Sequence, residues 1–230
     1  MKRTTIAAKC LRMVAIALLA AASFPPTFRA QTPAKTAQEP SPAEKYFTNT
    51  ELINQDGRAV RFYNDVLKDK VVVLDFFFST CQASCVPMNR NFAKVQELLG
   101  NRVGKEVFFV SVTVDPEMDT PAQLKKYAGS LHAGPGWLLL TGQKANVDFI
   151  LNKLGQYVAD KNDHTNIWII GNESTGLWKK AFGLAKAEDL VKVIESVMDD
   201  KRTPTPQRLD GITSALRVPD TRYWRPTTDY

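Results

Sequence analysis

The fold of this chain is decided by the stretch VVVLDFFF (residues 71–78), which STCQASC (residues 79–85) follows directly. The first eight residues are apolar except for Asp75 and are rich in β-branched and aromatic side chains, which is typical of a buried central strand. A helical pattern follows the second stretch and ends at Gly100. Two cysteines therefore stand where a central strand ends and a helix begins. Open α/β sheets bind ligands at this edge.

The segments on either side of this strand predict the rest of the architecture. Residues 51–62 carry a hairpin pattern with Asp56-Gly57 at its turn. Asp119-Thr120-Pro121 opens a helix in which Asp119 lies near the N-cap and Pro121 takes the first helical position. Further strands are expected at 107–114, 137–140, 167–170 and 177–182, and helices at 121–131, 145–154 and 187–198.

This order of strands and helices predicts the fold class. Strands that alternate with helices build a central sheet with helices packed on its faces. A βαβ unit followed by ββα is the arrangement of thioredoxin, so by analogy we expect a thioredoxin-like α/β fold. Its central mixed β-sheet would be flanked by helices and preceded by an N-terminal β-hairpin.

The net charge of +6 comes from the two ends of the 230-residue chain. Residues 1–30 hold five cations and no acids, and residues 201–230 hold six cations and three acids, which leaves 19 cations and 21 acids in 31–200. The basic balance is therefore no sign of a nucleic-acid-binding domain. A hydrophobic fraction of 44% also excludes a wholly disordered chain.

The N-terminus has the pattern of a secretory signal. Four basic residues within positions 2–12 precede the apolar run 13–22, and the uncharged stretch is too short for a stable membrane span. We therefore expect residues 1–30 to be a signal peptide, or alternatively a short uncleaved anchor in the inner membrane. Either implies export to a bacterial periplasm.

The remaining boundaries follow from composition. Residues 31–45 contain three prolines and almost nothing apolar, which indicates a linker. Residues 201–230 contain four prolines and six cations, which indicates a disordered tail or a segment that folds onto a partner. One domain is therefore expected at 46–200.

Cys81 and Cys85 are the most informative residues. They are the two cysteines outside the expected signal, in which Cys10 lies. A helix N-terminus stabilises a thiolate and raises the reactivity of a cysteine there. Residues i and i+4 of a helix project on one face, so both sulfurs could point at one soft ion such as Cu(I), although two are too few for a closed zinc site. A stabilising disulfide, dithiol redox chemistry and metal binding all remain possible at this point.

Four motifs together resemble the Sco (SenC-type) copper-chaperone family over about residues 48–199. They are the pair Cys81 and Cys85 after a hydrophobic strand, VDPEMDTP (residues 114–121), LTG (residues 140–142) and DHT (residues 163–165). The resemblance implies that Cys81, Cys85 and His164 bind a copper ion. It also implies that the protein delivers copper to the dinuclear copper (CuA) site of cytochrome c oxidase, or reduces the cysteines of that site.

Several further residues are weaker candidates. Asp75 resembles the buried acid of thioredoxins, where burial raises the pKa and lets the group take a proton from a thiol. Asp115, Glu117 and Asp119 form an acidic cluster that is expected mainly to build a loop and a helix start. Met88 and Met118 could be soft ligands, although Met88 is expected in the core. His132 is expected to be a solvated loop residue.

The sequence thus predicts a periplasmic Sco-type metallochaperone. Its expected partners are the copper-bearing subunit of cytochrome c oxidase and other copper or thiol carriers, with no nucleic acid, and with the membrane only if the N-terminal segment is not cleaved. The alternative is an enzyme, a thiol–disulfide oxidoreductase with Cys81 as the attacking thiolate and Cys85 as the resolving thiol. A thiol peroxidase is a weaker alternative, since no P-x-x-x-T-x-x-C pattern is present.

Overall fold

The structure, a computed structural model, describes residues 40–82 and 85–202. The expected signal at 1–30, most of the linker and almost all of the tail lie outside these residues. Within the described ranges, no helix combines the length and the apolar character that a membrane span requires.

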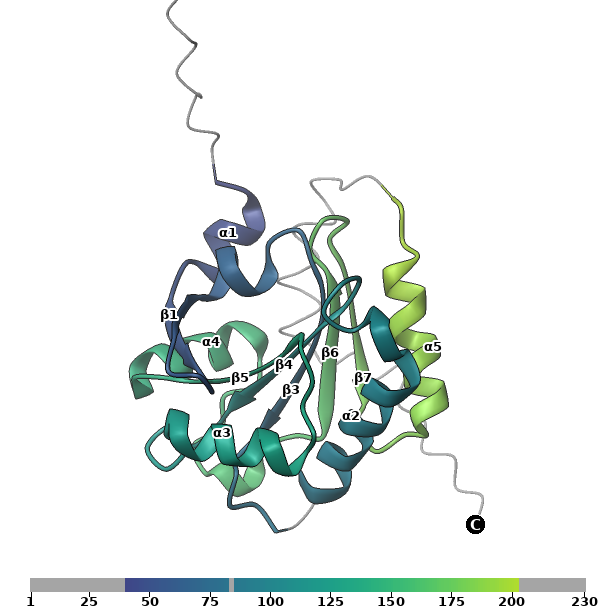
Figure 1. The fold of residues 1–230 in the computed structure, drawn as a ribbon. Helices are drawn as coiled ribbons and strands as arrows, with labels where there is room; N and C mark the ends of the chain where they lie inside the picture. The colour runs from purple at the N-terminus through teal and green to yellow at the C-terminus, as the bar shows by residue number, and fades with distance from the viewer. Residues whose placement is uncertain (1–39, 83–84, 203–230) are drawn as a thin grey trace, which may run out of the picture. The chain divides into compact units, whose positions relative to one another are not determined.

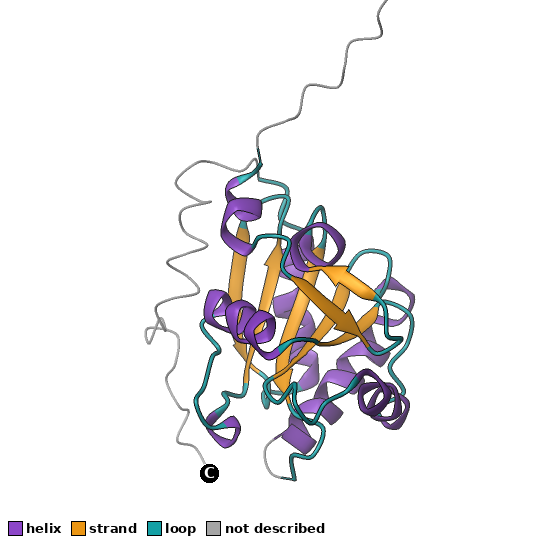
Figure 2. Cartoon of the chain, turned by 90° about the vertical axis from the view of Figure 1, so that its left-hand side faces the viewer, coloured by secondary structure: helices purple, strands orange, loops and turns teal. Residues whose placement is uncertain are grey.

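A seven-stranded mixed sheet forms the centre of the described domain (Figures 1 and 2). Its strands stand in the order β2-β1-β5-β4-β3-β6-β7. The three inner strands β5, β4 and β3 pair in parallel. Strand β1 pairs antiparallel with both β5 and β2, and β6 pairs antiparallel with both β3 and β7. Their bounds are β1 Glu51–Asn54, β2 Ala59–Arg61, β3 Val71–Phe77, β4 Phe108–Thr113, β5 Trp137–Thr141, β6 Ile167–Asn172 and β7 Leu177–Phe182.

Helices cover both faces of this sheet. Successive side chains of β3 point to opposite faces and are buried on both, so each face must be covered. Val72, Leu74 and Phe76 contribute to the core on one face, under α1 (Pro42–Phe47), the π-helix η1 (Phe62–Leu67) and α4 (Lys144–Leu154). Val73 and Phe77 contribute to the core on the other face, under α2 (Cys85–Leu99), α3 (Pro121–Ser130) and α5 (Ala187–Met198). Helices α2 and α5 lie side by side there (Figure 1). The predicted mixed sheet with flanking helices and an N-terminal hairpin is confirmed.

Two elements differ from the sequence-based expectations. Pro42–Phe47 is a helix, capped by the Ser41 side chain, so residues 42–45 are not the end of a linker. Phe47 is fully buried, and it contacts the rings of Phe62 and Trp178 at centroid distances of 6.0 and 5.7 Å. Immediately after the hairpin strands, η1 buries four side chains, of which Tyr63, Val66 and Leu67 lie in no predicted element. Helix α1 therefore belongs to the domain, because it closes the core on this face.

Candidate metal centre

Three strand ends bring the predicted site residues together. Strands β3 and β4 are parallel, so their carboxyl ends lie at the same edge of the sheet. Strand β6 is antiparallel to β3, so its amino end lies at that edge too. Cys81 follows β3, the segment 114–120 follows β4, and His164 precedes β6. Residues far apart in sequence therefore meet here, and Cys85 and His164 are 79 positions apart.

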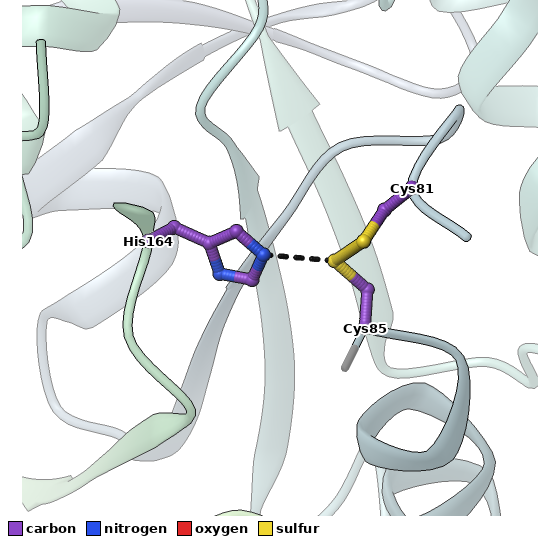
Figure 3. Close-up of side chains that lie close together, drawn as sticks. All are labelled: Cys81, Cys85 and His164. Atoms are coloured by element: carbon purple, nitrogen blue, oxygen red, sulfur yellow. Dashed lines mark hydrogen bonds between the residues drawn. A yellow bond between two sulfur atoms is a disulfide. The ribbon is translucent and has the colours of Figure 1, made fainter. Parts of the chain in front are cut away.

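Cys81 and Cys85 form a disulfide, and His164 lies directly beside it (Figure 3). The imidazole points at the sulfur of Cys85, with its Nε2 atom 2.8 Å from Sγ. The two sulfurs and one imidazole nitrogen lie within 4.8 Å of one another. Cys85 and His164 are buried, whereas Cys81 is half-buried and marks the side open to solvent.

The surroundings of His164 favour a neutral imidazole with a free Nε2 lone pair. Nδ1 lies 3.3 Å from the carbonyl oxygen of Thr165, to which its N–H donates. Burial lowers the pKa of His164, and the Thr165 carbonyl opposes that shift only in part. The rings of Phe78 and His164 pack nearly perpendicular to each other, with their centroids 5.6 Å apart. A histidine that donates one N–H to a backbone carbonyl and directs the other nitrogen at a shared point has the arrangement typical of metal ligands.

The chemistry of this donor set fits a soft ion. Two thiolates and one imidazole suit Cu(I), whereas a closed zinc site usually takes four ligands. In the disulfide, neither sulfur is a thiolate, so the pair must first be reduced before it can bind a metal. The same sulfurs can thus be either a disulfide or a pair of ligands.

The acidic segment after β4 differs in part from its predicted role. Thr120, and not Asp119, caps α3 by accepting from the backbone N–H of Gln123. Asp119 is instead fully buried and accepts hydrogen bonds from Ser79 and Thr113. Asp115 forms an ion pair with Lys161 at 2.6 Å, whereas Glu117 is exposed. Sequence reasoning singled out neither Ser79 nor Lys161, since their partners lie more than 39 positions away.

The other candidates divide between core and surface. Met88, in α2, is buried in the core, as expected, and Met118 is 58% exposed. His132 is exposed in its loop, as expected. Asp75 is fully buried on the same face of β3 as Val73 and Phe77, and burial raises its pKa to about 7. The expected burial of Asp75 is therefore confirmed.

Comparison with known proteins identifies the family. The family model described as SCO1/SenC matches residues 37–199. This chain belongs to the SCO1/SenC family. A SCO1 protein homolog of Bacillus subtilis (strain 168) is 38% identical over 90 residues, which are 39% of this chain and 45% of that protein. For the first relatives matched, the shared region is about half of their own length.

Solved structures of the same family share the fold. BsSco, described as a member of the Sco family of cytochrome c oxidase assembly proteins with a disulfide switch, is 27% identical, with a TM-score of 0.55 over 66% of this chain and 92% of that chain. Copper-bound ScoI of Bradyrhizobium japonicum is 24% identical, with a TM-score of 0.55 over 64% of this chain and 96% of that chain. The likeness confirms the expected thioredoxin-like fold for this chain.

Proposed function

We propose that this protein is an exported copper metallochaperone of the Sco type. The observation that carries the proposal is the cluster of Cys81, Cys85 and His164, whose ligand atoms lie within 4.8 Å of one another at the edge of the sheet. Its copper is cargo: the ion is taken up by the reduced protein and passed on. Membership of the SCO1/SenC family and the copper held by the Bradyrhizobium japonicum relative both support this proposal.

Each of the three residues has a distinct part in the proposed cycle. A thiol carrier first reduces the disulfide, which takes up two electrons and two protons. The two thiols then lose their protons as their sulfurs bind Cu(I), while the neutral imidazole of His164 completes the donor set. Cys81 is the half-buried member of the cluster, so an acceptor protein would reach its sulfur first.

The proposed recipient is the copper-bearing subunit of cytochrome c oxidase, reached in the periplasm. The description of BsSco as an oxidase assembly protein supports this recipient, and so does the basic and apolar start of the sequence, which has the pattern of a secretory signal. The protein would either deliver copper to the CuA site or keep the cysteines of that site reduced. Other copper or thiol carriers would be its partners upstream.

A thiol–disulfide oxidoreductase is the second candidate function. The observation that favours it is the disulfide itself, with a half-buried Cys81 and a fully buried Cys85. An attacking thiolate must reach its substrate, whereas a resolving thiol need only reach the mixed disulfide. This difference in exposure gives Cys81 the attacking role and Cys85 the resolving role.

Copper titration of the reduced full-length chain tests the main proposal. We expect one Cu(I) per chain, and we expect Cys81→Ser or Cys85→Ser to abolish tight binding. His164→Asn should weaken binding, whereas His132→Asn, a matched change at the exposed histidine, should not. A reduced protein that binds no copper, or that binds it equally well without His164, would contradict the metallochaperone reading. Intact copper binding with lost reductase activity in His164→Asn would favour the oxidoreductase.

A further inference from the structure

We propose that the segment 114–120 after β4 is a brace that holds both halves of the metal centre in place. Asp119 fixes the turn that carries Cys81, and Asp115 acts through Lys161 on the loop that carries His164. Both acids are positioning residues, because each acts through another residue and not on the sulfurs or the imidazole. The inference deepens the proposed function by naming what sets the geometry of the same site.

The first arm of the brace is the buried carboxylate of Asp119. It accepts from the backbone N–H of Ser79 at 3.1 and 3.2 Å and from the Ser79 hydroxyl. It also accepts from the Thr113 hydroxyl at 2.5 Å. Ser79 stands two residues before Cys81, on the turn between β3 and α2. Because its donors belong both to Ser79 and to Thr113 of β4, this buried side chain ties the turn to β4.

The second arm is the ion pair between Asp115 and Lys161. Their charged atoms are 2.6 Å apart, and the Asp115 side chain is only 12% exposed. Lys161 opens the short 3-10 helix η3 (Lys161–Asp163), and His164 follows it directly. The Lys161 ammonium also lies 5.0 Å from the ring centroid of Phe78, and the Phe78 ring packs against the imidazole of His164. The ion pair therefore restrains the position of His164 in two ways, through the adjoining backbone and through the Phe78 ring.

The two arms meet in one short, internally bonded segment. The Thr113 hydroxyl donates to Asp119 and accepts from the backbone N–H of Asp115 at 2.9 Å. The backbone N–H of Asp119 donates to the carbonyl of Asp115 at 2.9 Å. Movement of one carboxylate relative to the other would break these bonds. The segment thus connects both the turn that carries Cys81 and the loop that carries His164 to the end of β4.

The brace matters most when the disulfide is reduced. In the oxidised protein, the covalent bond itself holds Cys81 near Cys85. After reduction, the placement of Cys81 depends on non-covalent contacts of its turn, and ordering a loose turn lowers affinity for whatever the turn must bind. Loss of the Asp119 arm should therefore lower the effective concentration of one thiol at the other. Both disulfide formation and copper binding should become less favourable.

Asp119→Asn tests the first arm, with Glu173→Gln as its matched control. Glu173 is also a buried carboxylate, but it accepts from Tyr63 and from the backbone of Asp69, away from the site. Both changes remove a buried charge and lower stability. Only Asp119→Asn should shift the thiol–disulfide equilibrium of the Cys81–Cys85 pair against glutathione, by about tenfold toward the dithiol, which equals about 30 mV. It should also weaken Cu(I) binding several-fold at a temperature at which both variants are folded.

Lys161→Met tests the second arm, with Lys144→Met as its matched control. Lys144 forms an ion pair with Asp148 at 2.6 Å and lines a surface hollow together with Asp115 and Lys161, but it precedes no site residue. Lys161→Met should weaken Cu(I) binding several-fold and leave the thiol–disulfide equilibrium within twofold. Without copper, it should also move the ring-proton NMR signals of His164, which the Phe78 ring shifts. The two histidines of the chain make these signals simple to assign.

Equal behaviour of each variant and its control would overturn the proposal. If Asp119→Asn lowers the melting temperature as Glu173→Gln does but leaves the thiol equilibrium within twofold, Asp119 is a structural residue alone. If Lys161→Met leaves the His164 signals where Lys144→Met leaves them, the ion pair does not position the histidine. Both outcomes are measured on the copper-free protein. Failure of the brace is therefore distinguishable from failure of the metallochaperone proposal, which would appear as a wild type that binds no copper.

Discussion

Replacement of Asp75 by Asn should make the stability of the protein less dependent on pH. Asp75 is fully buried in β3, and neither of its carboxylate oxygens has a hydrogen-bond partner by normal geometry among the described residues. Burial raises the pKa of Asp75 from 3.8 to about 7, and the nearby Ser111 hydroxyl on the paired strand opposes this only in part. The folded protein therefore holds a proton on Asp75 that the unfolded chain releases at lower pH.

The sign and the size of the effect follow from this difference in pKa. A raised pKa contributes stability that is fully present below 3.8 and is lost as the pH rises through about 7. Roughly three pKa units correspond to about 4 kcal/mol of unfolding free energy lost by pH 8. About 2.5 kcal/mol of that loss falls between pH 5 and pH 8. Asn is neutral throughout, so Asp75→Asn should gain about that much relative to the wild type over this range.

Urea unfolding of the oxidised chain at pH 5, 6, 7 and 8 measures the difference between the two proteins. The lowered pKa of His164 makes a pH-dependent contribution of the opposite sign, but His164 is present in both chains, so this contribution cancels in the difference. Asp69→Asn makes the same substitution at an exposed aspartate and is the matched control. A difference between Asp75→Asn and wild type that stays constant from pH 5 to pH 8 would refute the burial argument.

Three further predictions concern copper, glycine and the tail. At free Cu(I) 100 times its dissociation constant, the reduced protein should gain about 2.7 kcal/mol of stability, measured as a raised melting temperature that Cys85→Ser lacks. Gly171→Ala should destabilise the fold by about 1–3 kcal/mol, because the new Cβ would lie 2.3 Å from the Trp178 ring. In α3, the Cβ of Gly129→Ala would meet nothing within 4 Å, so this change should stabilise the fold by about 0.5–1 kcal/mol. Chemical denaturation of both variants measures the two effects. Ending the chain after Arg202 should change neither the melting temperature nor copper affinity, since no proposed ligand follows His164; a clearly lower melt would show that the tail is part of the fold.

The local signals of the sequence predicted most elements, because each rests on neighbouring residues. The apolar run around Asp75 became β3, and Asp56-Gly57 became the hairpin turn, with Gly57 at φ +75°. Helix α1 was missed because its cap, Ser41, stands among prolines that indicate a linker. The π-helix η1 was missed because it begins at Phe62, the last residue of the predicted hairpin stretch, although the spacing of its buried residues at 62, 63, 66 and 67 is helical.

The site residues could be predicted, but the contacts that hold them could not. A cysteine pair at a helix start is a local pattern, and His164 was found through a family resemblance. Which of Asp119 and Thr120 caps α3 depends instead on donors that the fold brings in from 40 positions away. Thr120 faces its own helix, whereas Asp119 turns inward to Ser79 and Thr113. Two neighbouring residues with similar capping preference therefore take different roles for a tertiary reason.

The disulfide and the proposed copper ion compete for the same two sulfurs, which couples redox state to cargo. Because only the dithiol binds copper in this scheme, every tenfold excess of copper over its dissociation constant favours the reduced pair tenfold, or about 30 mV. By the same linkage, oxidation of Cys81 and Cys85 must expel the ion, since each state excludes the other. The half-buried position of Cys81 adds a direction to this exchange, because a partner's thiol can reach its sulfur while Cys85 stays buried against His164. A single cluster at the sheet edge can therefore serve both transfer of copper and exchange of thiols, and the redox state of the partner decides between them.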